Sequence, residues 1–321
     1  MAEAEVCRIG LGLAAVGRPA YITSGRDRDM GAARSVADMR NRTFDVLDAA
    51  YTGGIRHTDA ARSYGRAEEF LADWLRSRPE TADVRVSSKW GYRYVGEWSM
   101  DAATHEVKDH SLQAFTTQLN QSRALLGERL DLYQVHSVTM ESPVLTDIDL
   151  QNALGDLRDT GVRVGFSTSG PHQADVIRAA LSIGVNGARL FSSVQSTWNI
   201  LETSSGTALS EAAKQGVAAV VKEAFANGRL APGSGDRAPG VQHAMRMAAD
   251  LGIGVDQLAI AAALHQPWRP LVLSGAVNAS QITSHLAGAE VELPMTSIDA
   301  LRDAAEDPAD YWAARSQREW S

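Results

Sequence analysis

Four side chains that could move a proton stand where apolar runs of the sequence end: Asp59 and Tyr64 in RHTDAARSYG, Lys89 in VSSKW, and His136 in YQVHS. A free tyrosine has a pKa of about 10, too high for proton exchange at neutral pH unless a nearby ammonium favours the phenolate. Lys89 could be that ammonium, and Asp59 could supply its counter-charge. His136 would then donate a hydrogen bond to a carbonyl oxygen. The set predicts proton transfer coupled to reduction of a carbonyl.

Each of these residues also has an ordinary structural interpretation. Asp59 could cap a helix, Tyr64 could pack half-buried, Lys89 could be a surface amine, and His136 could be a hydrogen-bonded core histidine. Together, however, they follow three consecutive runs with strand character, which end RHTD, VSSK and YQVH. In an α/β barrel the C-terminal ends of the strands share one rim, where catalytic groups lie. A shared site explains this coincidence better than four separate roles.

Short β-rich runs alternate with helical patterns along the chain, as expected for βα units around a parallel sheet. Strands are predicted at residues 7–12, 54–59, 83–89, 130–136, 161–167, 188–195, 216–222 and 269–275. Helices are predicted at 37–52, 66–77, 111–127, 147–160, 171–183, 205–215, 241–265 in two pieces, and 280–287, with an added helix near 297–315. We therefore predict an α/β fold, a (β/α)8 TIM barrel with an added C-terminal helix, as a single domain over residues 1–321. An open doubly wound sheet is the alternative, weakened because no strand is followed by GxGxxG.

The composition is that of a folded protein, with 321 residues, of which 44% are hydrophobic and 22% charged. The formal net charge of −8 and the lack of a dense Lys/Arg run argue against nucleic-acid and acidic-membrane partners. Cys7 is the only cysteine, so we expect a buried thiol, no intrachain disulfide and a reducing compartment. No window reaches the ~18 apolar residues that span a bilayer, and no secretory signal pattern is present, so a cytoplasmic location is expected.

The segment DAARSYG (59–65) resembles the signature of the aldo-keto reductase family, Asp-x-Ala-x-x-Tyr-Gly. Lys89 and His136 occur at strand ends where that family has the other two members of its catalytic tetrad. The resemblance extends from GLGLA near the N-terminus to QITSHLAG near residue 288. It implies a (β/α)8 barrel that binds NADPH, less often NADH, without a Rossmann domain. It also implies hydride transfer between the nicotinamide and an aldehyde, ketone or sugar lactol.

Three polar residues resemble the family's contacts with the nicotinamide carboxamide. GFSTSG (165–170) is similar to a Gly-hydrophobic-Ser-Asn segment after the fifth strand, which implies this contact for Ser167 and Thr168. Thr168 stands where Asn is usual, so it keeps a hydroxyl but loses an amide. Gln195 in SVQSTWN matches the glutamine that ends the sixth strand. Turn and capping roles are the alternative for all three.

The seventh strand departs from the family pattern. Relatives commonly read aromatic-Ser-Pro-Leu there, with the ring stacked on the nicotinamide, whereas this chain reads KEAFANGRL. Lys222 therefore occupies the aromatic position. It could approach the pyrophosphate or ribose of the cofactor, or it could be a salt-bridged wall residue.

The eighth strand and the segment after it, VLSGAVNASQITSHL, resemble the part of the family that contacts the adenosine. Gln281 and His285 occupy positions near those that contact the adenine ribose and base. Ser274 and the backbone of Gly275 and Ala276 could hold a phosphate, since a helix N-terminus attracts anions. The arginine often used against the 2′-phosphate of NADPH is absent, and arginine is the side chain that binds phosphate in a bidentate way. NADPH is the expected cofactor, with NADH as the alternative.

Aromatic residues near the predicted rim suggest a ring-shaped or sugar-like carbonyl substrate. Trp90 and the loop GYRYVGEW (91–98) follow the third strand, while Tyr21 and Trp198 follow the first and sixth. The same residues could instead pack the rim. The Pro/Gly/Ser-rich stretch APGSGDRAPG (231–240) is a candidate lid, and a plain surface loop is the alternative.

Two other function classes are open. His57-x-Asp59 at a strand end could belong to a metal-dependent barrel hydrolase, but such a site needs further His or Asp ligands, so we expect no metal. HEVKDHS (105–111) offers two histidines, and a solvated helix start is the preferred interpretation of that segment. The second class is a cofactor-binding sensor or partner subunit with little turnover. The substrate, the direction of reaction and the oligomeric state do not follow from the sequence.

Overall fold

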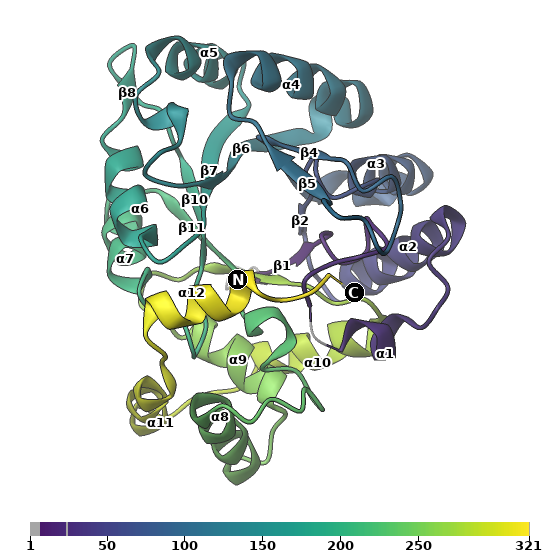
Figure 1. Ribbon diagram of the computed structural model, residues 1–321, viewed down its shortest axis with the longest axis vertical. Coiled ribbons are helices and arrows are strands. Elements are labelled where there is room, and N and C mark those ends of the chain that lie inside the picture. Colours follow the sequence, from purple (N-terminus) through teal and green to yellow (C-terminus); the bar gives the residue numbers. More distant parts are fainter. Residues whose placement is uncertain (1–6, 24, 321) are drawn as a thin grey trace, which may run out of the picture.

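A closed barrel of eight parallel strands forms the centre of the computed structural model, which describes residues 7–23 and 25–320 (Figure 1). In chain order the strands are β1 (Ile9–Gly12), β2 (His57–Asp59), β3 (Arg85–Trp90), β6 (Leu130–Val138), β7 (Arg163–Thr168), β10 (Ser193–Thr197), β11 (Ala218–Lys222) and β12 (Leu271–Ser274). β1 pairs with β2 on one side and with β12 on the other, which closes the ring. Every strand overlaps a predicted one in the predicted order, so the predicted (β/α)8 barrel is confirmed.

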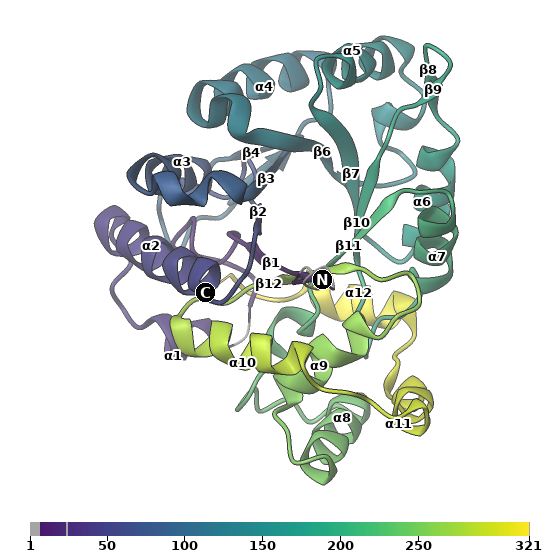
Figure 2. The ribbon, with the colours of Figure 1, turned by 180° about the vertical axis from the view of Figure 1, so that it is seen from behind.

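Most helices form a ring outside the strands, as Figures 1 and 2 show. They are α1 (Arg26–Met30), α2 (Val36–Thr52), α3 (Ala67–Ser77), α4 (Leu112–Leu126), α5 (Ile148–Asp159), α6 (Gln173–Leu181), α7 (Gly206–Lys214), α8 (Pro239–Asp250), α9 (Val255–Leu264), α10 (Ala279–Ala289), α11 (Met295–Ala300) and α12 (Pro308–Ser316). Side-chain caps fix several of their starts. Ser35 and Asp38 form a capping box at α2, and Asn278 accepts from the Gln281 amide at α10.

The predicted C-terminal helix is present, but the prediction of one continuous element near 297–315 is wrong in its bounds, because the segment forms α11 and α12. A 3₁₀ turn at Leu301–Ala304 ends α11, and Pro308 begins α12. The physical reason is the proline, which fits the first turn of a helix but not its interior. Figure 1 shows α12 and the segment after it crossing the barrel near β1. The C-terminal segment therefore reaches the rim on which the predicted catalytic residues lie.

Two short hairpins interrupt the βα pattern, and the first shortens a predicted strand. β8 (Gly184–Val185) and β9 (Ala188–Arg189) turn at Asn186 and Gly187, whose φ values are +54° and +74°. Asn-Gly is a favoured pair for such a hairpin turn. The prediction of one strand over 188–195 is therefore wrong in its first half.

The second hairpin pairs β4 (Tyr92–Tyr94) with β5 (Glu106–Lys108) in antiparallel order. It corrects the expectation of a solvated helix start at 105–111, where only Ser111 belongs to a helix start, as the N-cap of α4. His105 and His110 flank β5 and are both buried. The reason for the error is that β5 depends on a distant partner strand, which no local pattern reveals.

α9 is buried at every residue except Gln257, and α8 and α10 pack against it. Within residues 7–23 and 25–320, no single helix is long and apolar enough to cross a membrane. Among these described residues, only α8 and α9 taken together, bent by 95° at the break between them, reach that length and composition.

Candidate active site

The four predicted catalytic residues meet at the C-terminal rim of the barrel. Lys89 of β3 donates a hydrogen bond to Asp59 of β2, and its Nζ lies 3.3 Å from the Tyr64 hydroxyl. That hydroxyl lies 3.4 Å from Nε2 of His136 in β6. Lys89 is fully buried, and Asp59 and Tyr64 are 3% and 8% exposed. A phenol thus lies between an ammonium and an imidazole in a site largely shielded from water.

Two glycines hold Tyr64 in place. A Cβ on Gly17 would overlap the Tyr64 carbonyl and the Ala67 side chain, so glycine is required where the loop after β1 approaches this turn. Gly65 has a φ of +59°, in the left-handed region, and lies against Gly17. The Tyr64 amide donates to the Ala61 carbonyl at 3.0 Å. Backbone contacts therefore fix the position of the phenol.

Three donors inside the barrel hold the Asp59 carboxylate. Its Oδ1 accepts from Ser87 Oγ at 2.8 Å, Gln134 Nε2 at 3.2 Å and Gln195 Nε2 at 3.1 Å, while Oδ2 faces Lys89. Ser87 and Gln134 were not predicted, although each lies two positions before a predicted catalytic residue and so shares its face of the strand. The contact of Gln195 with a carboxamide stays a prediction; in this structure its amide stabilises Asp59.

Burial sets the protonation of the central pair. Burial and then the Asp59 charge raise the pKa of Tyr64 well above its usual 10, and the Arg18 cation offsets only part of this rise. The net rise comes from burial and the Asp59 charge, and the lowering of this pKa by the Lys89 ammonium stays a prediction. Burial and then the Lys89 cation hold the pKa of His136 well below 6.5. The site contains a protonated phenol beside a neutral imidazole.

Arg18 forms an unpredicted part of the rim. Its guanidinium carbon lies 5.0 Å from the ring centroid of Tyr64, 4.9 Å from that of Tyr21 and 4.6 Å from that of Trp320. Its Nη1 donates to Glu106 of β5 at 2.7 Å. The side chain is 1% exposed. The first loop, the β4–β5 hairpin and the C-terminal segment therefore meet at one buried cation.

A cavity of about 650 Å³ runs from the catalytic residues toward α10. Asp59, Tyr64 and His136 line one end. The predicted binding residues that line it are Tyr21, Gln195, Lys222, Ser274, Gly275, Gln281 and His285. A volume of this size suits a ligand considerably larger than a small carbonyl compound.

The two tryptophans predicted to bind substrate lie in the core instead. Trp90 is fully buried, and its ring centroid lies 5.1 Å from that of Phe115 in α4. It alternates with Lys89 along β3 and therefore points out of the barrel. Trp198 packs against Trp268 with ring centroids 6.0 Å apart. Neither residue lines the cavity, in contrast to the prediction.

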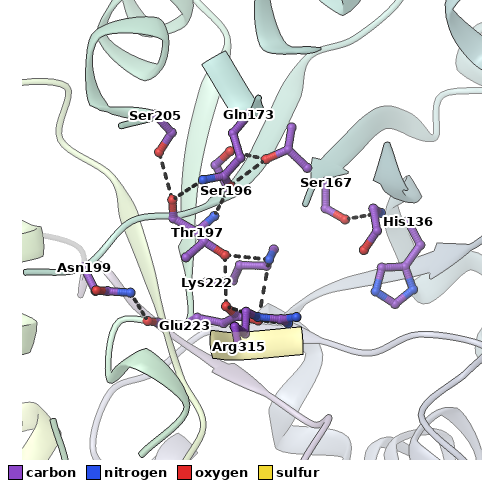
Figure 3. Close-up of polar contacts among 12 residues, drawn as sticks. His136, Ser167, Gln173, Ser196, Thr197, Asn199, Ser205, Lys222, Glu223 and Arg315 are labelled. Carbon is purple, nitrogen blue, oxygen red and sulfur yellow. Dashed lines mark hydrogen bonds and ion pairs between the residues drawn. The ribbon is translucent and has the colours of Figure 1, made fainter. Parts of the chain in front are cut away.

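Ser167 and Thr168, predicted to contact the carboxamide, are enclosed by protein atoms. Ser167 Oγ accepts from the Ser137 amide at 2.8 Å, and the Thr168 hydroxyl donates to Gln173 Oε1 at 3.0 Å (Figure 3). Both side chains are fully buried. Their neighbour Ser169 lines the cavity instead.

The other end of the cavity lies at the start of α10. Ser274 Oγ lies 2.8 Å from His285 Nδ1 and accepts from the Ala276 amide at 3.2 Å. Ala276 itself is buried and does not line the cavity. The Phe225 ring stacks on His285 with centroids 4.3 Å apart. Burial lowers the pKa of His285 to about 4, so this ring is neutral at physiological pH.

The loop 231–240, the candidate lid, borders the cavity between its two ends. Arg28 of α1 donates through Nη1 to the Gly233 carbonyl at 2.7 Å. The neighbouring Asp29 accepts from Gln281 Nε2 at 3.0 Å. α1, this loop and α10 are thereby joined across the cavity wall.

Lys222 ends β11 within a polar cluster (Figure 3). Its Nζ donates to Thr197 Oγ1 at 2.7 Å and lies 3.7 Å from Glu223 Oε1. Arg315 of α12 donates to the same carboxylate, with Nε 2.9 Å from Oε2. Burial lowers the pKa of Lys222 to about 8. Burial alone would raise the pKa of Glu223, but the charges of Arg315 and Lys222 hold this pKa at about 2.

A second cavity, of about 420 Å³, opens at the opposite end of the barrel and is lined by His57 and Cys7. Cys7, expected to be buried, is half-buried. His57 begins β2 and Asp59 ends it, so the two residues of the hydrolase motif belong to opposite ends of the barrel. In the part of the chain that the structure describes, no group of three or more His, Cys, Asp or Glu side chains could hold a metal ion.

The sequence matches the model of the aldo/keto reductase family over residues 9–306. Pyridoxal 4-dehydrogenase of Microbacterium luteolum is 29% identical over 216 residues, which are 58% of this chain and 62% of that protein. An uncharacterized oxidoreductase of Bacillus subtilis, YqkF, is 28% identical over 133 residues, 40% of each chain. The chain thus spans less than two thirds of the length of either curated relative.

Two solved structures share the barrel. Glycerol dehydrogenase AKR11B4 from Gluconobacter oxydans has a TM-score of 0.69 and 22% identity, covering 94% of this chain and 92% of that one. The holo form of aldo-keto reductase AKR11C1 from Bacillus halodurans has a TM-score of 0.68 and 19% identity, with the same coverage. Because the family match extends over nearly the whole barrel, the chain belongs to the aldo/keto reductase family.

Proposed function

We propose that this protein is an NAD(P)(H)-dependent oxidoreductase that interconverts an aldehyde, ketone or sugar lactone and the corresponding alcohol or lactol. The observation that carries the proposal is the position of the Tyr64 hydroxyl, 3.3 Å from Lys89 Nζ and 3.4 Å from His136 Nε2, at one end of a cavity of about 650 Å³. Such an arrangement places a proton donor and a hydrogen-bonding imidazole around one carbonyl oxygen.

Each residue has a separate task in this proposal. Tyr64 gives its proton to the substrate oxygen in reduction and takes it back in oxidation. Lys89 stabilises the resulting phenolate, and Asp59 keeps Lys89 in place while its own charge is held by three hydrogen bonds. His136, neutral because of burial, orients the carbonyl.

A bound nicotinamide cofactor would supply the hydride, so that carbonyl, NAD(P)H and a proton become alcohol and NAD(P)⁺. The residues present fit such a group. The cavity continues from the catalytic end to Ser274 and the neutral His285, against which Phe225 stacks. Gly275 lines the cavity, and no atom lies within 4 Å of where its Cβ would be, which allows close approach of a phosphate to the backbone. NADPH is proposed as the cofactor. NADH is the alternative, because residues 271–289 contain no arginine that could bind the 2′-phosphate of NADPH.

The names of the relatives support a small carbonyl or sugar-like substrate. One relative is named as a pyridoxal 4-dehydrogenase and one solved structure as a glycerol dehydrogenase. Residues 1–321 are proposed to act as a single barrel domain. A cytoplasmic location is proposed because a chain with one cysteine, Cys7, is suited to a reducing compartment.

Replacement of Tyr64 by Phe tests the proposal. Tyr64→Phe removes only the proton donor, so we expect turnover with a panel of aldehydes, ketones and sugars to fall by about 10²–10⁴ while cofactor binding persists. Tyr51→Phe is the matched control, since Tyr51 lies on α2 and its hydroxyl donates to the Glu80 carbonyl. Full activity of Tyr64→Phe would refute the role of Tyr64. Cofactor binding by the unaltered protein without turnover of any substrate would instead favour a sensor or partner subunit.

A further inference from the structure

Lys222 is a largely buried basic residue at the rim of the barrel. It is the last residue of β11, so its side chain starts from the same rim as Lys89 and His136. It lines the cavity that also contains Tyr64. Its ammonium is held by the Thr197 hydroxyl at 2.7 Å rather than directed to bulk solvent. The roles proposed for Asp59, Tyr64, Lys89 and His136 do not use this group.

The charges around Lys222 do not cancel. Among the described residues, Glu223 is the only carboxylate within 4.0 Å of the Lys222 ammonium, and Arg315 pairs with that same carboxylate. Lys89, by contrast, has a carboxylate of its own in Asp59. The Lys222, Glu223 and Arg315 cluster therefore leaves one positive charge beside the cavity.

We infer that Lys222 makes the cavity discriminate between the two redox states of the nicotinamide cofactor, binding the reduced form more tightly than the oxidised form. The inference rests on the proposed function. The oxidised ring carries a positive charge and the reduced ring does not. A ring that transfers hydride to a carbonyl whose oxygen lies at Tyr64 would lie near Lys222, since the Lys222 charge acts on His136 and His136 lies 3.4 Å from the Tyr64 hydroxyl. Like charges repel more strongly there than in water, because the site is largely buried.

The discrimination depends on pH because the charge of Lys222 does. Lys222 faces Glu223 of its own segment, Arg315 of α12, Lys89 of β3 and His136 of β6, and its charge is felt at His136. Burial lowers the pKa of Lys222 to about 8, so the ammonium is present at pH 6.5 and is lost at pH 9.5. The preference for the reduced cofactor is therefore greatest in mild acid and declines above the pKa.

Fluorescence titration with oxidised and reduced cofactor, each as NAD and NADP, measures this preference without turnover. The quantity compared is the ratio of the Kd of the oxidised form to the Kd of the reduced form. We expect Lys222→Met to lower this ratio about tenfold at pH 6.5, which corresponds to ~1.4 kcal/mol. Lys222→Arg keeps the charge, so its ratio should stay within about twofold of the original. Lys214→Met, on the exposed end of α7, is the control for loss of a lysine.

The pH series tests the inference even if Lys222→Met does not fold. The ratio for the unaltered protein should fall between pH 6.5 and pH 9.5, whereas that of Lys222→Arg should stay constant, because arginine remains charged. Equal ratios at both pH values in the unaltered protein, or an unchanged ratio in folded Lys222→Met, would show that Lys222 is only a salt-bridged wall residue. Failure of the unaltered protein to bind any nicotinamide cofactor would instead overturn the proposed function.

Discussion

The Lys89 ammonium lies 3.3 Å from the Tyr64 hydroxyl, and neither side chain has substantial access to water. A buried ammonium without a negative partner is costly, and here Asp59 supplies that partner at rest. When Tyr64 gives up its proton, the phenolate becomes a second negative partner at a distance already set. Lys89 therefore stabilises the state after proton transfer without having to move.

Replacement of Lys89 by Met should abolish turnover and also weaken the fold. The variant leaves Asp59 charged and buried without its cation, so we expect the free energy of unfolding to fall by about 3–5 kcal/mol and turnover to fall at least ~10²-fold. Urea denaturation measures the first quantity and steady-state kinetics the second. The double variant Asp59→Asn/Lys89→Met removes both charges and should regain much of the stability but no activity. Recovery of activity in that double variant would contradict the role of Lys89.

The stability of the protein should decline as the pH falls from about 6.5 to about 4. Burial lowers the pKa of His110 and of His285 to about 4, and it holds that of His136 well below 6.5. Because the unfolded chain binds protons at these histidines in that interval and the folded chain does not, acid favours unfolding by about 1.4 kcal/mol per pH unit for each group. Urea denaturation between pH 7 and pH 4 gives the slope. His285→Asn should reduce it, and His172→Asn should not, since His172 is 75% exposed.

Gly17→Ala should lower kcat, because the added side chain displaces Tyr64. The added Cβ would meet the Tyr64 carbonyl and the Ala67 side chain, so the turn that carries the phenol must shift. A displacement of about 1 Å at a reacting group can reduce turnover by about 10²-fold. The control is Gly184→Ala in the β8–β9 hairpin, where the nearest atom to the added Cβ is the Ala188 carbonyl oxygen at 3.5 Å, an ordinary contact. Equal kcat values for the two variants would show that this close approach does not position Tyr64.

Trp320→Ala should loosen the β4–β5 hairpin on the far side of the cavity mouth. The Trp320 ring stacks on His105 at 4.3 Å and lies 4.6 Å from the Arg18 guanidinium carbon, which in turn pairs with Glu106. Loss of the ring removes a cation–π contact of about 0.5–2 kcal/mol. Hydrogen exchange at residues 105–108 should therefore become faster in Trp320→Ala and much less so in Trp320→Phe. Unchanged exchange at these amides in Trp320→Ala would mean that the C-terminal segment does not brace the hairpin.

The sequence alone predicts the site residues that lie on the strands of the barrel. Asp59, Lys89 and His136 lie at strand ends, and the rule that parallel strands share a rim brings them together without knowledge of tertiary contacts. Side chains alternate between the two faces of a strand, so a Lys89 that points into the barrel excludes its neighbour Trp90 from the cavity. The prediction that Trp90 binds substrate could therefore have been avoided from the sequence. Arg18 could not have been found this way. It lies in a loop, and its contacts come from segments distant in sequence.

β1 pairs with both β2 and β12, so the barrel stays open along one edge of β1 until β12 pairs with it. Ile9 lies opposite Val272 in the register of β1 and β12, so the ring closes only when nearly the whole chain is available. Until then, β1 and β11 each expose a row of unpaired amides and carbonyls, the kind of surface on which chains associate with one another. A chain cut before β12 would therefore be prone to aggregation, even though Asp59, Tyr64, Lys89 and His136 all lie upstream of the cut.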